Sequence, residues 1–132
     1  MKAVIINNLG HPVPPDVLRY LEEQQYDEIQ LFSSRDMFLD REKDLGEQVR
    51  EVLFDLLQQQ PSGKKLSEVE GEKFFLAPGY SPGAILIYSA LVSLIPPPPR
   101  FLITGKGLRS NQIELKQEID LSGWSNWWRS EG

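Results

Sequence analysis

A strand, a tight turn and a helix start follow one another within residues 73–94, and this succession limits the possible folds more than any other feature. The apolar run 73–77 predicts a strand. The turn 78–83 comes next and carries Ser81, a good N-cap residue, before Pro82, which suits the first helical position. Such a turn directs backbone N–H groups and the positive end of a helix dipole to one point, where an anion can bind. A plain connection in an α/β domain, without a ligand, fits the same residues.

The rest of the chain continues this alternation of strands and helices. Its first apolar run is rich in β-branched residues, which is typical of a strand covered on both faces. In chain order we expect strand 3–7, a helix opening at Pro14–Asp16 and closing near Gln25, strand 27–32, helix 40–60 with a start weakened by Gly46, strand 73–77, helix 82–94, strand 100–104 and strand 113–121. The last strand alternates apolar and polar residues, as an antiparallel edge strand does.

This order predicts an α/β fold. We expect a small Rossmann-like, mostly parallel sheet with helices on both faces and an antiparallel edge strand. The length of 132 residues suits a single domain over 1–132. Because helix 82–94 is almost uniformly apolar, it should be buried against the sheet, a neighbouring helix or another subunit.

Composition argues against several classes of function. The chain has no cysteine and one histidine, so we expect no disulfide, no metal and no cofactor. A net charge of −5 argues against duplex DNA or RNA as a partner. The longest apolar run, 84–95, is shorter than the roughly 20 residues that span a bilayer. The first apolar run is too short for a signal peptide, so we expect a cytoplasmic protein without a membrane partner.

Polar or glycine-rich loops follow three of the expected parallel strands, at 7–11, 79–83 and 105–106. Ligands on such sheets bind at the carboxyl ends of the strands, so these loops should converge on one site. None of them is a GxGxxG or GxxxxGK[ST] motif, so NAD and ATP chemistry lack support. The candidate ligand-binding residues are Asn8, Gly10, His11, Gly79, Tyr80, Ser81, Gly83 and Lys106.

Two of these side chains allow more than one role. His11 either contacts a ligand or holds its own turn through a backbone hydrogen bond. Tyr80 either stacks on a purine or packs over its loop. No HExxH, CxxC or GxSxG motif is present, so the residues alone indicate no catalytic group.

The segments Asn8-Leu9-Gly10-His11-Pro12 and Pro78-Gly79-Tyr80-Ser81-Pro82-Gly83-Ala84, each leading into a helix, resemble the small stand-alone CRISPR-associated proteins of type III systems. The resemblance implies a minimal CARF (Rossmann-like) fold and a dimer that binds cyclic oligoadenylate, with cyclic tetra-adenylate the expected ring. Family members either cut this antiviral second messenger or sequester it. The resemblance places Asn8, His11, Tyr80, Ser81 and Gly83 near the ligand, and this chain has Gly10 where relatives are expected to carry a serine hydroxyl.

Three functions follow from these expectations. The first is a homodimer or higher homo-oligomer that binds cyclic oligoadenylate and lowers its free level. The second is a metal-independent ring nuclease, which needs only a ribose 2′-hydroxyl aligned with its phosphate and donors for the developing charge. The third is an assembly module without a small ligand. In that module helix 82–94 and the tail 122–132, with Trp124, Trp127 and Trp128, would make subunit contacts. The alternative for the tail is a short segment that docks on its own domain.

Overall fold

The computed structural model describes residues 1–34, 39–108 and 112–120, so the Trp-rich tail 122–132 lies outside the described residues. Strands and helices alternate as the sequence predicts. The elements are β1 (Lys2–Asn7), α1 (Pro15–Glu23), β2 (Glu28–Ser33), α2 (Leu45–Gln58), β3 (Glu72–Leu76), α3 (Ser81–Leu94), β4 (Arg100–Lys106) and β5 (Ile113–Ile119).

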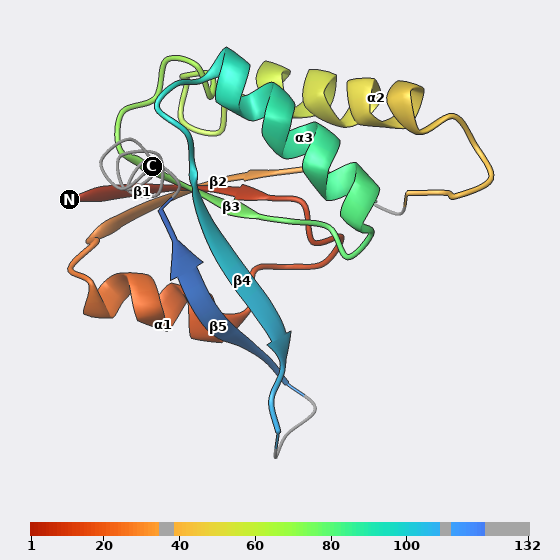
Figure 1. Cartoon of the computed structure of the whole chain (residues 1–132). Helices are drawn as coiled ribbons and strands as arrows, with labels where there is room; N and C mark the ends of the chain where they lie inside the picture. Colours follow the sequence, from red (N-terminus) through yellow and green to blue (C-terminus); the bar gives the residue numbers. More distant parts are fainter. Residues whose placement is uncertain (35–38, 109–111, 121–132) are drawn as a thin grey trace, which may run out of the picture.

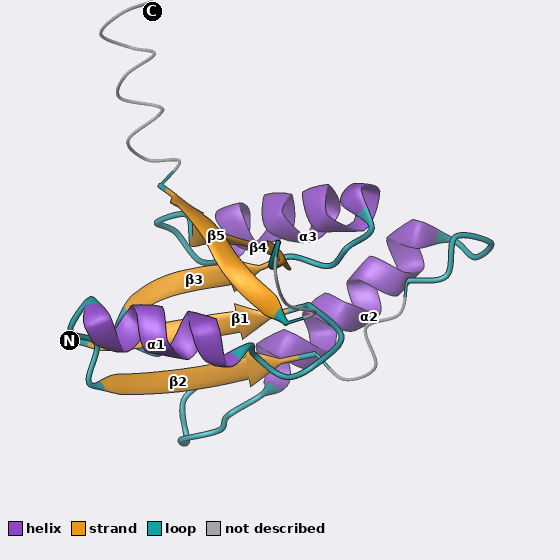
Figure 2. Ribbon diagram, turned by 90° about the horizontal axis from the view of Figure 1, so that it is seen from below, coloured by secondary structure: helices purple, strands orange, loops and turns teal. Residues whose placement is uncertain are grey.

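These strands form one five-stranded sheet in the order β2-β1-β3-β4-β5. The pairs β1/β2, β1/β3 and β3/β4 are parallel, and β4/β5 is antiparallel. Helix α1 covers one face, and α2 and α3 cover the other (Figures 1 and 2). The predicted α/β architecture, with a mostly parallel sheet, helices on both faces and an antiparallel edge strand, is therefore confirmed.

Strand β1 lies at the centre of both hydrophobic layers. Its side chains alternate between the faces, so Ala3 and Ile5 pack in the cluster under α1 while Val4 and Ile6 pack in the cluster under α2 and α3. All four are fully buried. The sequence predicts that β1 is covered on both faces, and the structure confirms it. Its apolar run is continuous because side chains on both faces are buried.

Two helix starts differ from the sequence-based expectation. Helix α3 begins at Ser81 with Tyr80 as its N-cap, so Ser81 is not the cap and Pro82 is not the first helical residue. Proline is equally tolerated one position further on, since the first backbone N–H groups of a helix have no partner within it. Helix α2 begins at Leu45, where Asp44 accepts a hydrogen bond of 3.0 Å from the backbone N–H of Glu47.

Strand β4 also extends beyond its predicted end. Gly105 and Lys106 were expected in a loop, but they pair with Glu114 and Ile113 of β5. Antiparallel pairing supplies partners for their backbone groups, which prolongs the strand into a hairpin. The hairpin projects away from the other strands (Figure 1).

Contacts from α1 hold β5 in place. The Tyr20 hydroxyl donates to Glu118 Oε2 at 2.7 Å, and Asp16 Oδ2 accepts from the backbone N–H of Leu115 at 2.7 Å. Burial, followed by the bond to Glu118, raises the pKa of Tyr20 to about 12. The Leu115 N–H, followed by Arg19, holds the pKa of Asp16 below its usual value.

Within the described chain, helix α3 is buried on one side only, and its expected cover by another subunit stays a prediction. Its inner face, with Ile87 and Leu91, packs on the sheet, whereas Ile85, Leu86 and Leu94 are exposed among the residues that the structure describes.

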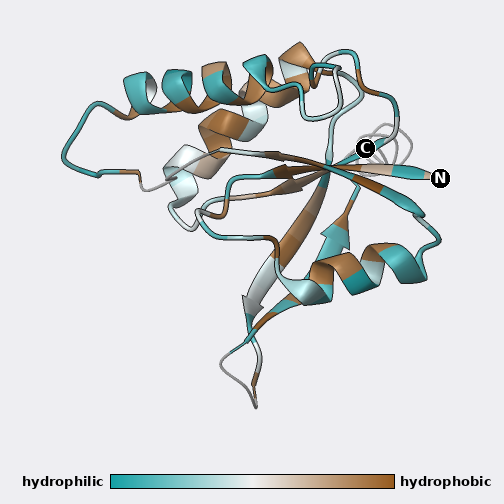
Figure 3. Cartoon of the chain, turned by 180° about the vertical axis from the view of Figure 1, so that it is seen from behind, coloured by the Kyte–Doolittle hydropathy of each residue, from teal (hydrophilic) through white to brown (hydrophobic). Residues whose placement is uncertain are grey.

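In Figure 3, α1 shows the mixed teal and brown of an amphipathic helix. None of the helices in the described ranges has the length and apolar character needed to cross a membrane.

Candidate functional site

The strand order places a topological switch point between β1 and β3. From β1 the chain crosses to β2 on one side of the sheet, and from β3 it crosses to β4 on the other side. The loops that follow β1 and β3 therefore leave the same edge in opposite directions, and ligands of open α/β sheets bind in the crevice between such loops.

The loop after β1 is shaped by Asn7. Its Oδ1 accepts from the backbone N–H of Leu9 at 3.0 Å, and its Nδ2 donates to the carbonyl of His11 at 2.9 Å. Gly10, between these two residues, has a φ of 83°, a backbone conformation that favours glycine. Asn7 and Gly10 thus give the loop one defined course and leave His11 exposed at its end.

Asn8 ties together the ends of three strands. Its backbone N–H donates to Leu76 of β3 at 2.9 Å, and its Nδ2 donates to Ser34 Oγ, just after β2, at 2.7 Å. The side chain is fully buried, and its Oδ1 has no hydrogen-bond partner among the described residues. A buried amide oxygen without a donor costs free energy.

A cleft of about 330 Å³ opens where the loops after β1 and β3 meet β4. Within the described residues, pairing of β3 with β4 covers Phe74–Arg100 and Phe75–Phe101, after which the two strands diverge. The space between them is lined by Leu9, His11, Ala77, Pro78, Gly79, Phe101, Leu102, Ile103 and Thr104. Its walls present polar and apolar surface in about equal measure. Its volume is within the usual range for small-molecule sites.

The N-terminus of α3 follows one wall of this cleft and is electrostatically open. The Tyr80 side chain makes no capping hydrogen bond in the described structure, and the first turn has no acidic residue. The guanidinium carbon of Arg41 lies 4.8 Å from the centre of the Tyr80 ring, a cation–π contact. A full positive charge therefore lies close to the positive end of the helix dipole.

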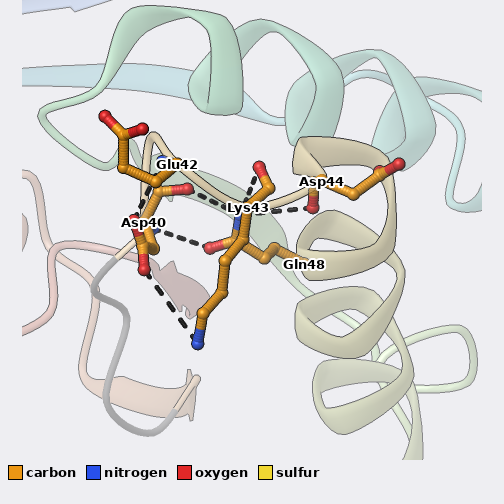
Figure 4. Close-up of polar contacts among 5 residues, drawn as sticks. All are labelled: Asp40, Glu42, Lys43, Asp44 and Gln48. Atoms are coloured by element: carbon orange, nitrogen blue, oxygen red, sulfur yellow. Dashed lines mark hydrogen bonds and ion pairs between the residues drawn. The ribbon is translucent and has the colours of Figure 1, made fainter.

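The segment that carries Arg41 is held by a compact polar network at the start of α2 (Figure 4). Gln48 Nε2 donates to the carbonyl of Asp40 at 2.9 Å, and Gln48 Oε1 accepts from the backbone N–H of Asp40 at 2.7 Å. Asp40 Oδ1 also accepts from the Glu42 N–H at 2.9 Å. Both residues that flank Arg41 are thereby bonded, which restrains the backbone from which its side chain extends.

The structure brings together some of the predicted residues and separates others. His11 and Gly79 line the cleft, Gly10 adjoins His11, Asn8 lies buried at the base of the same loop, and Tyr80 and Ser81 start the neighbouring helix. Gly83 is buried on the inner side of α3, where an added Cβ would collide with Leu39. Lys106 is exposed in the hairpin, beyond Thr104, the last β4 residue that lines the cleft.

Sequence reasoning missed the contribution of β4. Residues 101–104 form one wall of the cleft, although the sequence assigned the site contribution of this strand to the loop after it. Their apolar pattern predicts a strand, but it does not predict where the pairing between β3 and β4 ends. Arg41 was also missed, because it is 39 residues away from Tyr80 and only the folded chain places them in contact.

The cleft offers binding groups rather than a metal centre. Among its lining residues His11 is the one titratable side chain. The described part of the chain holds no group of three or more His, Asp or Glu side chains placed to bind a metal ion. Comparison of the chain with protein-family models, with curated proteins and with solved structures found no match.

Proposed function

We propose that the protein binds cyclic oligoadenylate, with cyclic tetra-adenylate the preferred ring, and lowers its free level by holding it. The observation that carries this proposal is the cleft between the loop after β1, the loop after β3 and the diverging edge of β4. The apolar part of its walls, with Leu9 and Phe101, suits the flat face of an adenine. Tyr80 directly follows the lining residue Gly79 in the chain.

The phosphates of the ring would lie toward the start of α3. There the backbone N–H groups of the first turn, the helix dipole and Arg41 supply positive potential. The overall charge of −5 does not oppose such a ligand, because a small anion responds to the local field. A two-fold homodimer would present two such clefts to a ring that shares its symmetry.

Cleavage of the ring is the second candidate function, and one contact favours it. His11 Nδ1 lies 2.9 Å from the carbonyl oxygen of Pro12. A carbonyl oxygen only accepts, so Nδ1 carries a proton in this contact, and in the neutral form of the ring Nε2 then has the lone pair. An exposed imidazole in that tautomer could accept the proton of a ribose 2′-hydroxyl.

Binding and its location can be tested with one pair of matched variants. Titration calorimetry with cyclic tetra-adenylate should give a stoichiometry of one ring per two chains. Arg41→Glu should weaken binding about tenfold or more, which corresponds to about 1.4 kcal/mol. Arg50→Glu makes the same charge change on the exposed side of α2 and should leave the affinity unchanged within about twofold.

Chromatography of the ligand after incubation separates the two functions. An intact ring supports sequestration, whereas linear products that disappear in His11→Ala support the nuclease. If no cyclic adenylate binds, or if Arg41→Glu and Arg50→Glu bind equally well, the proposed site is wrong.

A further inference from the structure

Helix α3 has an uncovered apolar side, here called the outer face of α3 and made of Ile85, Leu86, Ser89, Ser93 and Leu94. Its three large side chains are 64%, 43% and 51% exposed, in the order Ile85, Leu86, Leu94. The serines between them are also exposed and leave room for a close neighbour. Apolar side chains at this density along one helix face indicate that something covers them.

The described chain ends beside one end of this face. Strand β5 runs antiparallel to β4, so it finishes near the start of β4, where Ile119 pairs with Phe101. Asp120 then lines a small cavity of about 110 Å³ together with Pro97 and Pro98, which directly follow α3. Asp120, the last described residue, thus lies next to the prolines that follow α3.

The sequence of 121–132 matches the outer face in length and pattern. Leu121, Trp124 and Trp128 are spaced three and four residues apart, the spacing of one helix face. Twelve residues in a helix extend about 18 Å at about 1.5 Å per residue. The outer face from Leu94 back to Ile85 spans nine residue steps, or about 14 Å on the same basis.

A second copy of the chain fits this face less well. A stable protein–protein interface buries roughly 800 Å² on each partner and uses about 20–30 residues a side. The outer face provides three large apolar side chains, which is a small patch by that measure. One tryptophan buries about 150–250 Å², so two or three of them match a patch of this size.

We propose that residues 121–132 pack on the outer face of α3 of the same chain. The segment runs from the C-terminal end of α3 toward its N-terminus and places Leu121, Trp124 and Trp128 against Ile85, Leu86 and Leu94. This inference does not depend on the proposed ligand.

Tryptophan fluorescence of the full chain tests the proposal directly, because all three tryptophans lie in this segment. The parent protein should emit at shorter wavelength than free tryptophan and resist quenching by acrylamide. Ile85→Glu should shift the emission toward that of free tryptophan and increase quenching. Phe54→Glu is the matched control, since Phe54 on α2 is also 64% exposed and should leave both readings unchanged.

Three results would overturn the proposal. One is emission of the parent that already equals that of free tryptophan. Another is an equal response of emission to Ile85→Glu and Phe54→Glu. The third is a blue shift that fades on dilution while light scattering shows dissociation, because the segment would then be covered by a second copy. A blue shift that is constant on dilution and lost in Ile85→Glu supports packing within one chain.

Discussion

The sheet consists of a closely paired part and a divergent part. In the paired part, β1 pairs with β2 over six positions and with β3 over five. In the divergent part, β4 keeps two positions with β3 and then turns toward β5. The paired part carries buried side chains on both faces, whereas the divergent part opens the cleft. Loss of pairing at one seam thus creates the space that a ligand needs.

Two features accompany the divergence of β4 from β3, one within the hairpin and one between β5 and α1. The register of β4 with β5 shifts between Ile103 and Thr104, and such irregularities increase the twist of a strand pair. The Tyr20 hydroxyl donates to Glu118 and the Asp16 carboxylate accepts from the Leu115 N–H, and these two bonds connect β5 to α1. The hairpin is therefore attached to a helix as well as to the sheet.

The largest loss of stability is expected at Phe75, which lies where the paired part meets the divergent part. It pairs with Ile6 and Phe101, and its ring lies 5.1 Å from that of Phe101. Phe75→Ala should lower the free energy of unfolding by about 3–5 kcal/mol, because it empties the shared core. Urea denaturation measures this loss. Phe54→Ala, at an exposed position, should stay within about 0.5 kcal/mol of the parent, and equal losses would contradict a shared core.

Glycine substitutions compare the packing of the two parts. Gly71 precedes β3 with a φ of 130°, and an added Cβ would lie 2.7 Å from the carbonyl oxygen of Lys2. Gly71→Ala should therefore cost about 1–3 kcal/mol of stability. Gly79 has nothing within 4 Å of an added Cβ, so Gly79→Ala should cost about 0.5 kcal/mol or less. Thermal and urea unfolding measure both, and a similar loss in the two variants would show that the parts are packed alike.

A smaller effect is expected at the contact between α1 and β5. Tyr20→Phe removes the hydrogen bond to Glu118 and should cost about 1 kcal/mol. Because the pKa of Tyr20 is raised from 10.0 to about 12, its contribution is fully present below pH 10 and is lost as the pH rises through about 12. The parent should lose stability over that interval, and Tyr20→Phe should lack this part of the decline.

Amide hydrogen exchange locates the same effect. Tyr20→Phe should speed exchange in β5 while β1, buried in the paired part, keeps its protection. Equal acceleration in both strands would mean that the divergent part does not open separately.

Much of the fold could be predicted from the sequence because its signals are local. The β-branched run of β1, the amphipathic spacing of α1 and α2 and the turn before α3 each indicate an element from neighbouring residues alone. The loops after β1 and β3 follow from that order, since parallel strands end at one edge of the sheet. His11 and Gly79 were found in this way.

The tertiary structure alone decided how these loops become a site. Whether β4 stays with β3 depends on twist and on the hold of α1 on β5, contacts between residues about 100 positions apart. The burial of Asn8, the place of Arg41 beside Tyr80 and the exclusion of Lys106 from the cleft have the same origin. Periodicity specifies which side of an element is apolar, but the distance between two elements is a property of the packed chain.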